Sequence, residues 1–245
     1  MWGSFVFNQQ MVEFKGQVLP SDHPQSLRVQ YIFRKILETM EKDLGVGGEA
    51  ATTSRGPRRG ATHHLNGLNW EVRVVNGEKK NAYALPGGKI VVFSGIMEVF
   101  NSDAEIAIIL GHEIAHVVGR HAAESIGRVL LGLICGLVLR KVLRVQQIDL
   151  SHDMLNYILQ KPFSRGLEKE ADRIGLLLSS GAGYDPRIAP DLYRKLGNNT
   201  SMLDDYISTH PSGETRAKHL SEDAFMKRAI RRYEESINGE FGFPQ

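Results

Sequence analysis

Cysteine is almost absent from this sequence, because Cys135 is the only one among 245 residues. A single cysteine excludes an internal disulfide framework and any zinc site built from several thiolates. A metal ion in this protein would therefore have to be held by histidine and carboxylate side chains.

Long apolar runs are also missing, and none reaches the roughly 20 residues that a membrane-spanning helix needs. The nearest is the run from Val129 to Leu139, which has Arg128 before it and Arg140 after it. As a helix it would reach about 16 Å, against a hydrocarbon core of about 30 Å. Two interpretations stay open for this run. It is either a helix that inserts partly into a membrane surface, with its basic flanks among the headgroups, or a buried core helix or cap helix over the active site.

An excess of charge of one sign is lacking as well, since 30 basic residues face 28 acidic ones. This balance gives no indication of nucleic acid binding. The first residues, MWGSFVFNQQMVEFKGQ, contain neither a secretory signal nor an Arg-rich amphipathic presequence. Either the protein is not imported, or these residues do not include the native start.

The remaining pattern predicts one domain over residues 21–238, with an extension at 1–20 and a tail at 239–245. Within it, residues 46–67 are rich in Gly, Thr, Ser and Arg and are predicted to form a loop. Residues 126–145 contain the apolar run. Helical spacing of apolar residues predicts helices at 21–45, 103–123, 164–180, 186–197 and 213–237.

A small sheet is predicted between the loop and the second helix. Trp70, Val72 and Val74 alternate as in a half-buried strand, and Pro86 to Gly88 form a turn between two further strands. The second of these runs from Lys89 to Phe93. We expect the strands to form a small antiparallel sheet.

The stretch LGHEIAHVVGRHAAE contains His112, Glu113 and His116, which form H-E-x-x-H on a predicted helix. Histidines four residues apart lie one turn apart on the same helix face, so both imidazoles can reach one metal ion. The glutamate then lies beside the water that zinc activates for peptide hydrolysis. A chance match on a core helix is disfavoured, because buried histidines and glutamate are costly unless something satisfies them.

His121 follows this motif, and its spacing raises the question of a third ligand. On a continuous helix it lies nine residues after His112, roughly 180° around the axis. We therefore expect His121 to face away from the metal, toward a polar or membrane-adjacent surface.

A better third ligand is found in the segment SRGLEKEADRIG. Glu168 and Asp172 lie one turn apart on one helix face, whereas Glu170 points elsewhere. A glutamate commonly completes a His-His-Glu zinc site. An aspartate one turn later is well placed to accept a hydrogen bond from the free N–H of a zinc-bound histidine. Ala171 between them is small enough to let the two helices pack closely.

H-E-x-x-H followed by SRGLEKEAD resembles the signature of the zinc metalloendopeptidases that include the CAAX prenyl protease and the HtpX-type membrane proteases. The sequence is more similar still to the Oma-type mitochondrial inner-membrane peptidases, through VLPSDHP, NAYALPGGKIVVFSGI, LGHEIAHVVGRHAAE and HPSGETR. The resemblance implies one zinc ion held by His112, His116 and Glu168. It also implies Glu113 as the catalytic acid and base, with Asp172 as partner of a zinc-bound histidine.

The resemblance has further implications for the substrate and for location. The strand of Lys89, Ile90, Val91, Val92 and Phe93 would pair with an extended substrate backbone at the cleft edge. His210 would lie near the zinc and stabilise the oxyanion, and Arg216 would serve a structural or polar-network role. The implied setting is quality control or stress-induced processing at the mitochondrial inner membrane. The implied substrates are unfolded or membrane proteins.

We therefore predict an α+β, zincin-like fold, mostly helical, with the small antiparallel sheet at the active-site cleft. The predicted function is zinc-dependent endopeptidase activity with peripheral or monotopic membrane contact, and a homo-oligomer is compatible with the sequence. Two alternatives remain. One is a catalytically silent zinc-binding homologue that acts as a scaffold, against which the intact Glu113 argues. The other is a CAAX-type prenyl-protein protease, against which the lack of several spanning segments argues.

Overall fold

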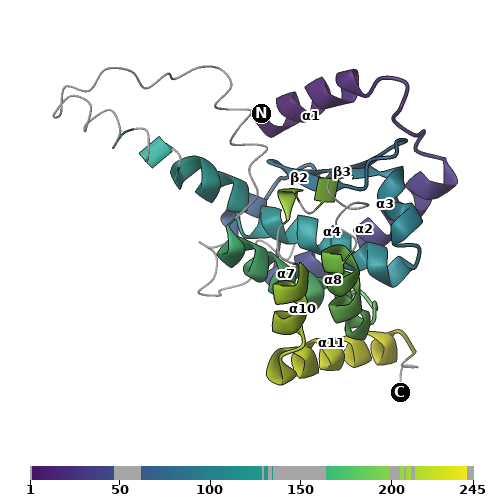
Figure 1. The fold of residues 1–245 in the computed structure, drawn as a ribbon, viewed down its shortest axis with the longest axis vertical. Coiled ribbons are helices and arrows are strands. Elements are labelled where there is room, and N and C mark those ends of the chain that lie inside the picture. The colour runs from purple at the N-terminus through teal and green to yellow at the C-terminus, as the bar shows by residue number, and fades with distance from the viewer. Residues whose placement is uncertain are drawn as a thin grey trace.

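The computed structural model describes residues 2–46, 62–128, 130–131, 134, 164–198, 205–206, 208–210 and 213–241. Three layers are visible in Figure 1: a single helix above, a small sheet in the middle and a helical body below. The described elements are α1 (Trp2–Glu13), α2 (Pro24–Leu44), η2 (His63–Leu65), β1 (Glu71–Val75), β2 (Ala82–Leu85), β3 (Lys89–Phe93), α3 (Ser94–Val99), α4 (Asp103–Val118), α7 (Arg165–Gly181), η3 (Pro186–Ile188), α8 (Ala189–Asn198), α10 (Gly213–Leu220) and α11 (Asp223–Phe241).

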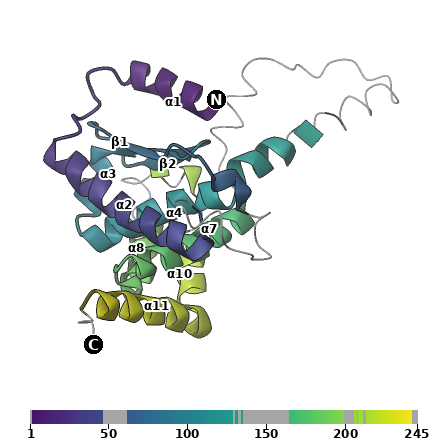
Figure 2. The same ribbon diagram turned by 180° about the vertical axis from the view of Figure 1, so that it is seen from behind.

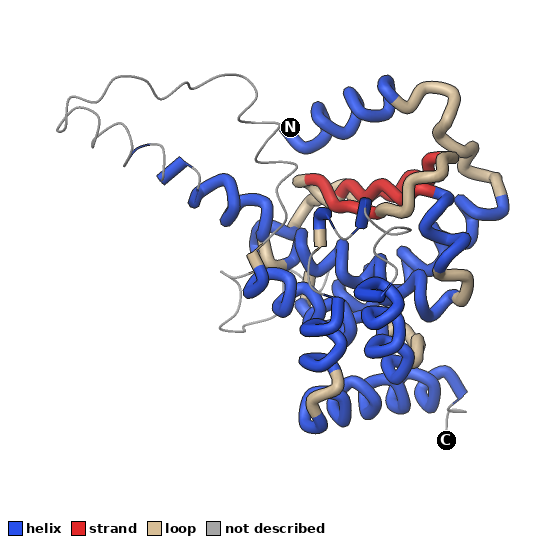
Figure 3. The backbone as a smooth tube through the Cα atoms, in the orientation of Figure 1, coloured by secondary structure: helices blue, strands red, loops and turns tan. Residues whose placement is uncertain are grey.

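The strands, red in Figure 3, form one mixed sheet whose order is β1-β3-β2. β2 and β3 form the expected antiparallel hairpin around the Pro86–Gly88 turn, in which Gly87 and Gly88 both have positive φ. β1 lies on the other side of β3 and is parallel to it, so the prediction of an antiparallel sheet was wrong. The reason is topological. The connection from β1 to β3 contains β2 and is long enough to bring the chain back in the same direction.

Helix α1 lies on the outer face of the sheet and seals a small apolar cluster against it (Figure 1). Phe7 is 2% exposed and packs with Val91 and Phe93 of β3. Tyr83 Oη of β2 donates to Gln10 Oε1 of α1 at 3.0 Å. The residues predicted to be an N-terminal extension are therefore packed against the predicted domain.

The opposite face of the sheet covers the main core, which is built from α2, α4, α7 and α8. Val29, Ile32, Ile36 and Met40 of α2 are fully buried, so the predicted amphipathic helix is confirmed. This helix ends at Gly45, which has φ 62 in the left-handed region, as glycine at a helix C-terminus commonly does. Figure 2 shows α2 crossing the back of the helical body.

Two predicted helices are divided in the structure. The helix predicted at 103–123 ends at Val118, and Arg120 has φ 58 before helical residues resume at 121. The helix predicted at 213–237 is divided into α10 and α11 at Ser221 and Glu222. The prediction at 164–180 is confirmed by α7.

The apolar run at 129–139 lies largely outside the described residues, as does most of the loop predicted at 46–67. Near the start of the run, Leu130, Leu131 and Ile134 are each more than half exposed. Within the described parts of the chain, no helix combines enough length with enough apolar character to cross a membrane.

Candidate active site

Helix α4 presents His112, Glu113 and His116 inside the protein. Ser102 and Glu105 form a capping box that satisfies the first backbone N–H groups of this helix. Residues 105–116 are all buried, so the histidines and the glutamate have almost no contact with water. The exposed fraction is 3% or less for each of the three side chains. Such burial is costly for polar groups unless each finds a partner.

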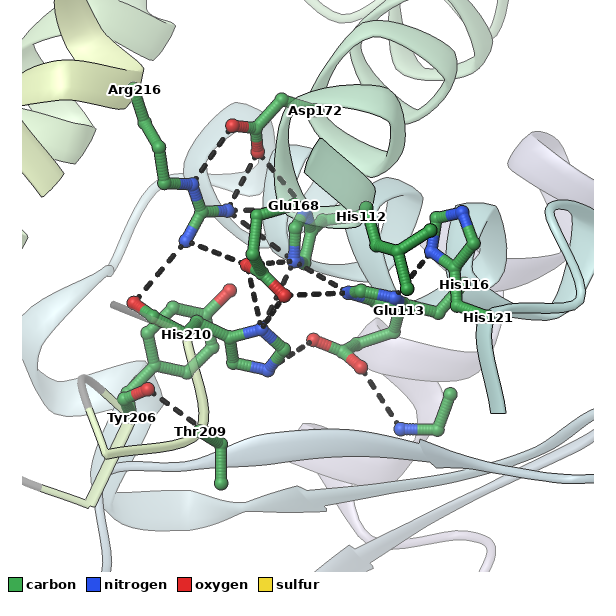
Figure 4. Close-up of polar contacts among 12 residues, drawn as sticks. His112, Glu113, His116, His121, Glu168, Asp172, Tyr206, Thr209, His210 and Arg216 are labelled. Atoms are coloured by element: carbon green, nitrogen blue, oxygen red, sulfur yellow. Dashed lines mark hydrogen bonds and ion pairs between the residues drawn. The ribbon is translucent and has the colours of Figure 1, made fainter. Parts of the chain in front are cut away.

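The partners come from α7 and from the segment before α10 (Figure 4). The Nε2 atoms of His112 and His116 are 3.0 Å apart. Glu168 of α7 brings Oε2 to 3.4 Å from His112 Nε2 and Oε1 to 3.5 Å from His116 Nε2. Two imidazole nitrogens and a carboxylate thus converge on one point, as ligands do around a metal ion.

His210 completes this group from a third direction. Its Nδ1 lies 3.2 Å from His112 Nε2 and 3.1 Å from Glu168 Oε2. One ligand atom from each of His112, His116, Glu168 and His210 lies within 4.8 Å of the others. The ring of Tyr206 packs over the His210 ring with centroids 4.6 Å apart, which fixes the position of that imidazole.

Close packing of α4 on α7 brings the two histidines to the glutamate. A Cβ atom on Gly175 would lie 2.7 Å from backbone atoms of Gly111 and His112. Ser179 Oγ donates to the Ala107 carbonyl oxygen at 2.8 Å across the same contact. Ala171, predicted to allow this approach, is fully buried. Glycine facing glycine is what permits the helix backbones to touch.

Asp172 lies one turn beyond Glu168 and faces the other nitrogen of His112. Its Oδ1 is 3.0 Å from His112 Nδ1, so it accepts the N–H that leaves Nε2 available to a metal. Arg216 donates from Nε to Asp172 Oδ2 at 2.8 Å and from Nη2 to Oδ1 at 2.6 Å. Tyr193 Oη also donates to Oδ1, at 2.8 Å. The family resemblance implied only a structural or polar-network role for Arg216, and nothing in the local pattern pointed to Tyr193.

His121 occupies a position that the sequence did not predict. Its Nδ1 is 2.8 Å from His116 Nδ1, and the side chain is fully buried. His121 is not part of the metal-binding group of His112, His116, Glu168 and His210, but the expectation that it faces a polar or membrane-adjacent surface was wrong. It assumed a continuous helix, but α4 ends at Val118 and the left-handed Arg120 turns the chain back.

Electrostatics divide the carboxylates of the site into two classes. Burial by itself raises the pKa of Glu168 and of Asp172. Nearby positive charges and hydrogen bonds outweigh this effect and hold the pKa of each carboxyl well below its usual range. Burial instead raises the pKa of Glu113, which lacks an equally strong partner. A raised pKa suits a group that must both take up and release a proton near neutral pH.

The same surroundings raise the pKa of the His112 imidazole. Burial and the Arg216 guanidinium lower its pKa, but hydrogen bonds to Asp172 and Glu168 outweigh both and raise the pKa to about 9. Burial and the positive charge of His112 hold the pKa of His116 well below its ordinary value. His116 therefore stays neutral, in the state that a metal ligand requires.

The strand predicted to receive the substrate does not have a free edge. β3 is bonded to β1 on one side and to β2 on the other, and all five residues Lys89–Phe93 are buried. The prediction that this strand pairs with a substrate was therefore wrong. Lys89 Nζ, for example, is directed to Glu71 Oε2 at 2.8 Å.

The edge that does face the site belongs to β2. Asn81 offers its carbonyl oxygen to Phe93 of β3, so the alternating Ala82 and Ala84 direct their backbone groups outward. The N–H of Ala84 donates to Glu113 Oε2 at 2.9 Å. This contact fixes the glutamate between the metal-binding group and the sheet edge.

Comparison with known proteins is consistent with this geometry. Residues 55–224 match the sequence model of peptidase family M48. Over 98% of its length the chain is 36% identical to the mitochondrial metalloendopeptidase OMA1 of Arabidopsis thaliana and 31% identical to that of Saccharomyces cerevisiae. It spans 60% of the plant protein and 67% of the yeast one. Over 58% of its length it is 26% identical to the beta-barrel assembly-enhancing protease of Escherichia coli, of which it spans 32%.

Proposed function

This chain belongs to peptidase family M48, and on that premise we propose that it is a zinc-dependent endopeptidase of mitochondria. It would hydrolyse internal peptide bonds of unfolded or membrane proteins during quality control or stress-induced processing at the inner membrane. The mitochondrial assignment rests on relatives whose names place them in that organelle.

One observation carries the chemical part of the proposal. His112, His116 and Glu168 bring two imidazole nitrogens and a carboxylate to one buried point, with Glu113 beside it. Nitrogen donors combined with one carboxylate suit zinc, whereas calcium and magnesium prefer oxygen ligands throughout. When bound there, zinc would act as a Lewis acid and lower the pKa of a water molecule to near 7.

Glu113 is the residue that would move the proton. Its Oε2 is held by the Ala84 N–H, while Oε1 accepts no hydrogen bond from the described residues and lies 3.4 Å from His210 Nε2. That oxygen can take a proton from the attacking water and pass it to the amine nitrogen of the broken peptide bond. The protein chain forms no covalent bond to the substrate in this scheme.

Substrate would bind along the free edge of β2. Ala84 is partly exposed, and because its N–H is bonded to Glu113, its carbonyl oxygen is the backbone group that would pair with an extended chain. Such main-chain pairing is largely independent of sequence. An unfolded segment offers such a backbone, and a folded domain does not. Leu130, Leu131 and Ile134, which follow α4 in the chain, are apolar and exposed. They support a peripheral contact with a membrane surface.

The proposal is tested by comparing the wild type with Glu113→Gln. Both proteins are loaded with zinc, the bound metal is quantified by mass spectrometry, and cleavage of an unfolded reporter protein is followed. We expect equal zinc content and a loss of cleavage by at least about a hundredfold in the variant, since general acid–base catalysis contributes that much. Equal cleavage by both proteins would exclude Glu113 from the chemistry.

The position of His210 favours a second candidate, a catalytically silent zinc-binding scaffold. Four protein ligands enclose structural zinc sites, whereas catalytic sites keep one position open. With His210 counted, four side chains surround the point described above. If neither protein cleaves while both hold zinc, this second function is the one to keep.

A further inference from the structure

A cavity opens beside the metal-binding group, between the end of β2 and the end of α4. Its volume is about 140 Å³, close to that of an engineered cavity that takes up benzene. The turn after β2, the last turn of α4 and the helical residues that follow Arg120 form its walls. The apolar part of the lining consists mainly of Leu68, Leu85, Pro86, Val117, Ala122 and Ala123.

Two residues join this cavity directly to the catalytic group. His116 lines it while its Nε2 belongs to the metal-binding cluster. Ala84 lines it while its backbone N–H binds Glu113. A chain paired with the edge of β2 therefore passes the metal-binding group and the cavity in immediate succession.

Strand geometry sets which part of a substrate could enter. An extended chain rises about 3.3 Å per residue and directs alternate side chains to one face. Ala84 marks the level of Glu113, and Pro86 lies two residues further along the chain, at the start of the turn that follows β2. One substrate side chain within two positions of the scissile bond is then directed at the cavity.

We propose that this cavity is a specificity subsite for one apolar side chain of leucine or phenylalanine size next to the scissile bond. The inference rests on the proposed peptidase function and on binding at the edge of β2. Main-chain pairing gives affinity without sequence preference, and a pocket for one alternate side chain adds selectivity.

Arg120 gives this subsite a preference against basic side chains. It contributes to the lining and is exposed, with φ 58 that places it at the chain reversal after α4. His64 also lines the cavity at this end of α4, where its Nε2 lies 3.1 Å from the Val118 carbonyl oxygen. A lysine side chain entering between them would lose hydration and meet a like charge.

The test measures peptide binding separately from hydrolysis. Fluorescent peptides of about eight residues, in which each position in turn is Gly, Leu, Phe or Lys, are titrated onto zinc-loaded Glu113→Gln and followed by anisotropy. We expect one position at which Leu and Phe bind about tenfold or more tightly than Gly, the scale of selectivity that apolar pockets reach. At that position Lys should bind no better than Gly.

Filling the cavity should remove this preference. Ala122→Leu and Ala123→Leu are introduced into Glu113→Gln, and the exposed Ala123 tolerates the larger side chain without loss of folding. Gly127→Leu in the same helical segment is the matched control, because it adds a bulky apolar side chain at a position outside the lining, where a Cβ would meet nothing within 4 Å. The control should keep the preference for leucine.

The proposal is overturned if no position distinguishes Leu from Gly, or if the preference survives in both filled variants. Hydrolysis of the same peptides by the wild type separates the two proposals. A preserved preference without any hydrolysis would support the subsite and contradict the proposed endopeptidase function.

Discussion

The contact between Gly111 of α4 and Gly175 of α7 leads to a quantitative prediction. A Cβ at position 175 would lie 2.7 Å from backbone atoms of α4, whereas ordinary contact begins at 3.4 Å. Gly175→Ala must therefore push the helices apart by the difference, about 0.7 Å. Neither backbone can yield as a flexible side chain could, so we expect an overpacking cost of about 1–3 kcal/mol in the free energy of unfolding.

The same displacement should weaken metal binding. Glu168 lies on α7 and the two histidines proposed as ligands lie on α4, so separation of the helices moves the carboxylate away from both imidazoles. Metal–ligand distances tolerate only about ±0.2 Å. We therefore expect zinc affinity to fall by about tenfold or more, a loss comparable with that from disturbing the support of a ligand.

Urea unfolding of the metal-free proteins and competitive zinc titration of the folded proteins measure these two effects. Gly166→Ala, in the same helix, is the matched control, because a Cβ there would meet nothing closer than 3.9 Å. That substitution should stabilise the protein by about 0.4–1 kcal/mol by restricting the unfolded chain. If Gly175→Ala unfolds at the wild-type urea midpoint and binds zinc with wild-type affinity, the close helix crossing does not set the ligand geometry.

Three further predictions concern the residues behind the ligands. Arg216→Met should lower the free energy of unfolding by about 3–5 kcal/mol, because it leaves the buried Asp172 without its cation. Adding Asp172→Asn should recover part of that loss in a double-mutant cycle. In chelator, stability should fall as pH rises from 6.5 through about 9, because the folded state holds a proton on His112 more tightly than the unfolded chain does. Stability should also fall below about pH 4, where the depressed pKa of Asp172 makes its protonation costly; urea midpoints across the pH range test both limbs. His121→Phe should keep the fold but lower zinc affinity about 10–100-fold by removing the partner of His116, and His121→Gln should restore part of it.

Much of the catalytic helix could be predicted from local spacing. H-E-x-x-H fixes the relation of His112, Glu113 and His116 because an α-helix has one repeat. The same rule places Asp172 one turn from Glu168, and the structure brings both to His112. Prediction was least reliable where the chain had to be located in three dimensions. Sequence showed the β2–β3 hairpin through its Pro-Gly-Gly turn, but it held no local signal for which edge of β3 receives β1.

The error over His121 has a more specific cause, which lies in where α4 ends. The angle of roughly 180° from His112 holds only if the helix continues, and Gly119 is the kind of residue at which helices stop. In the structure a Cβ at position 119 would lie 2.3 Å from His121 Nε2. Glycine at 119 and the left-handed Arg120 thus act together: one clears the space and the other turns His121 back beneath His116. A helix stop at Gly119 could be read from the sequence, but it does not say where the chain goes next; the left-handed conformation of Arg120, for which the sequence held no local signal, decides that His121 is buried.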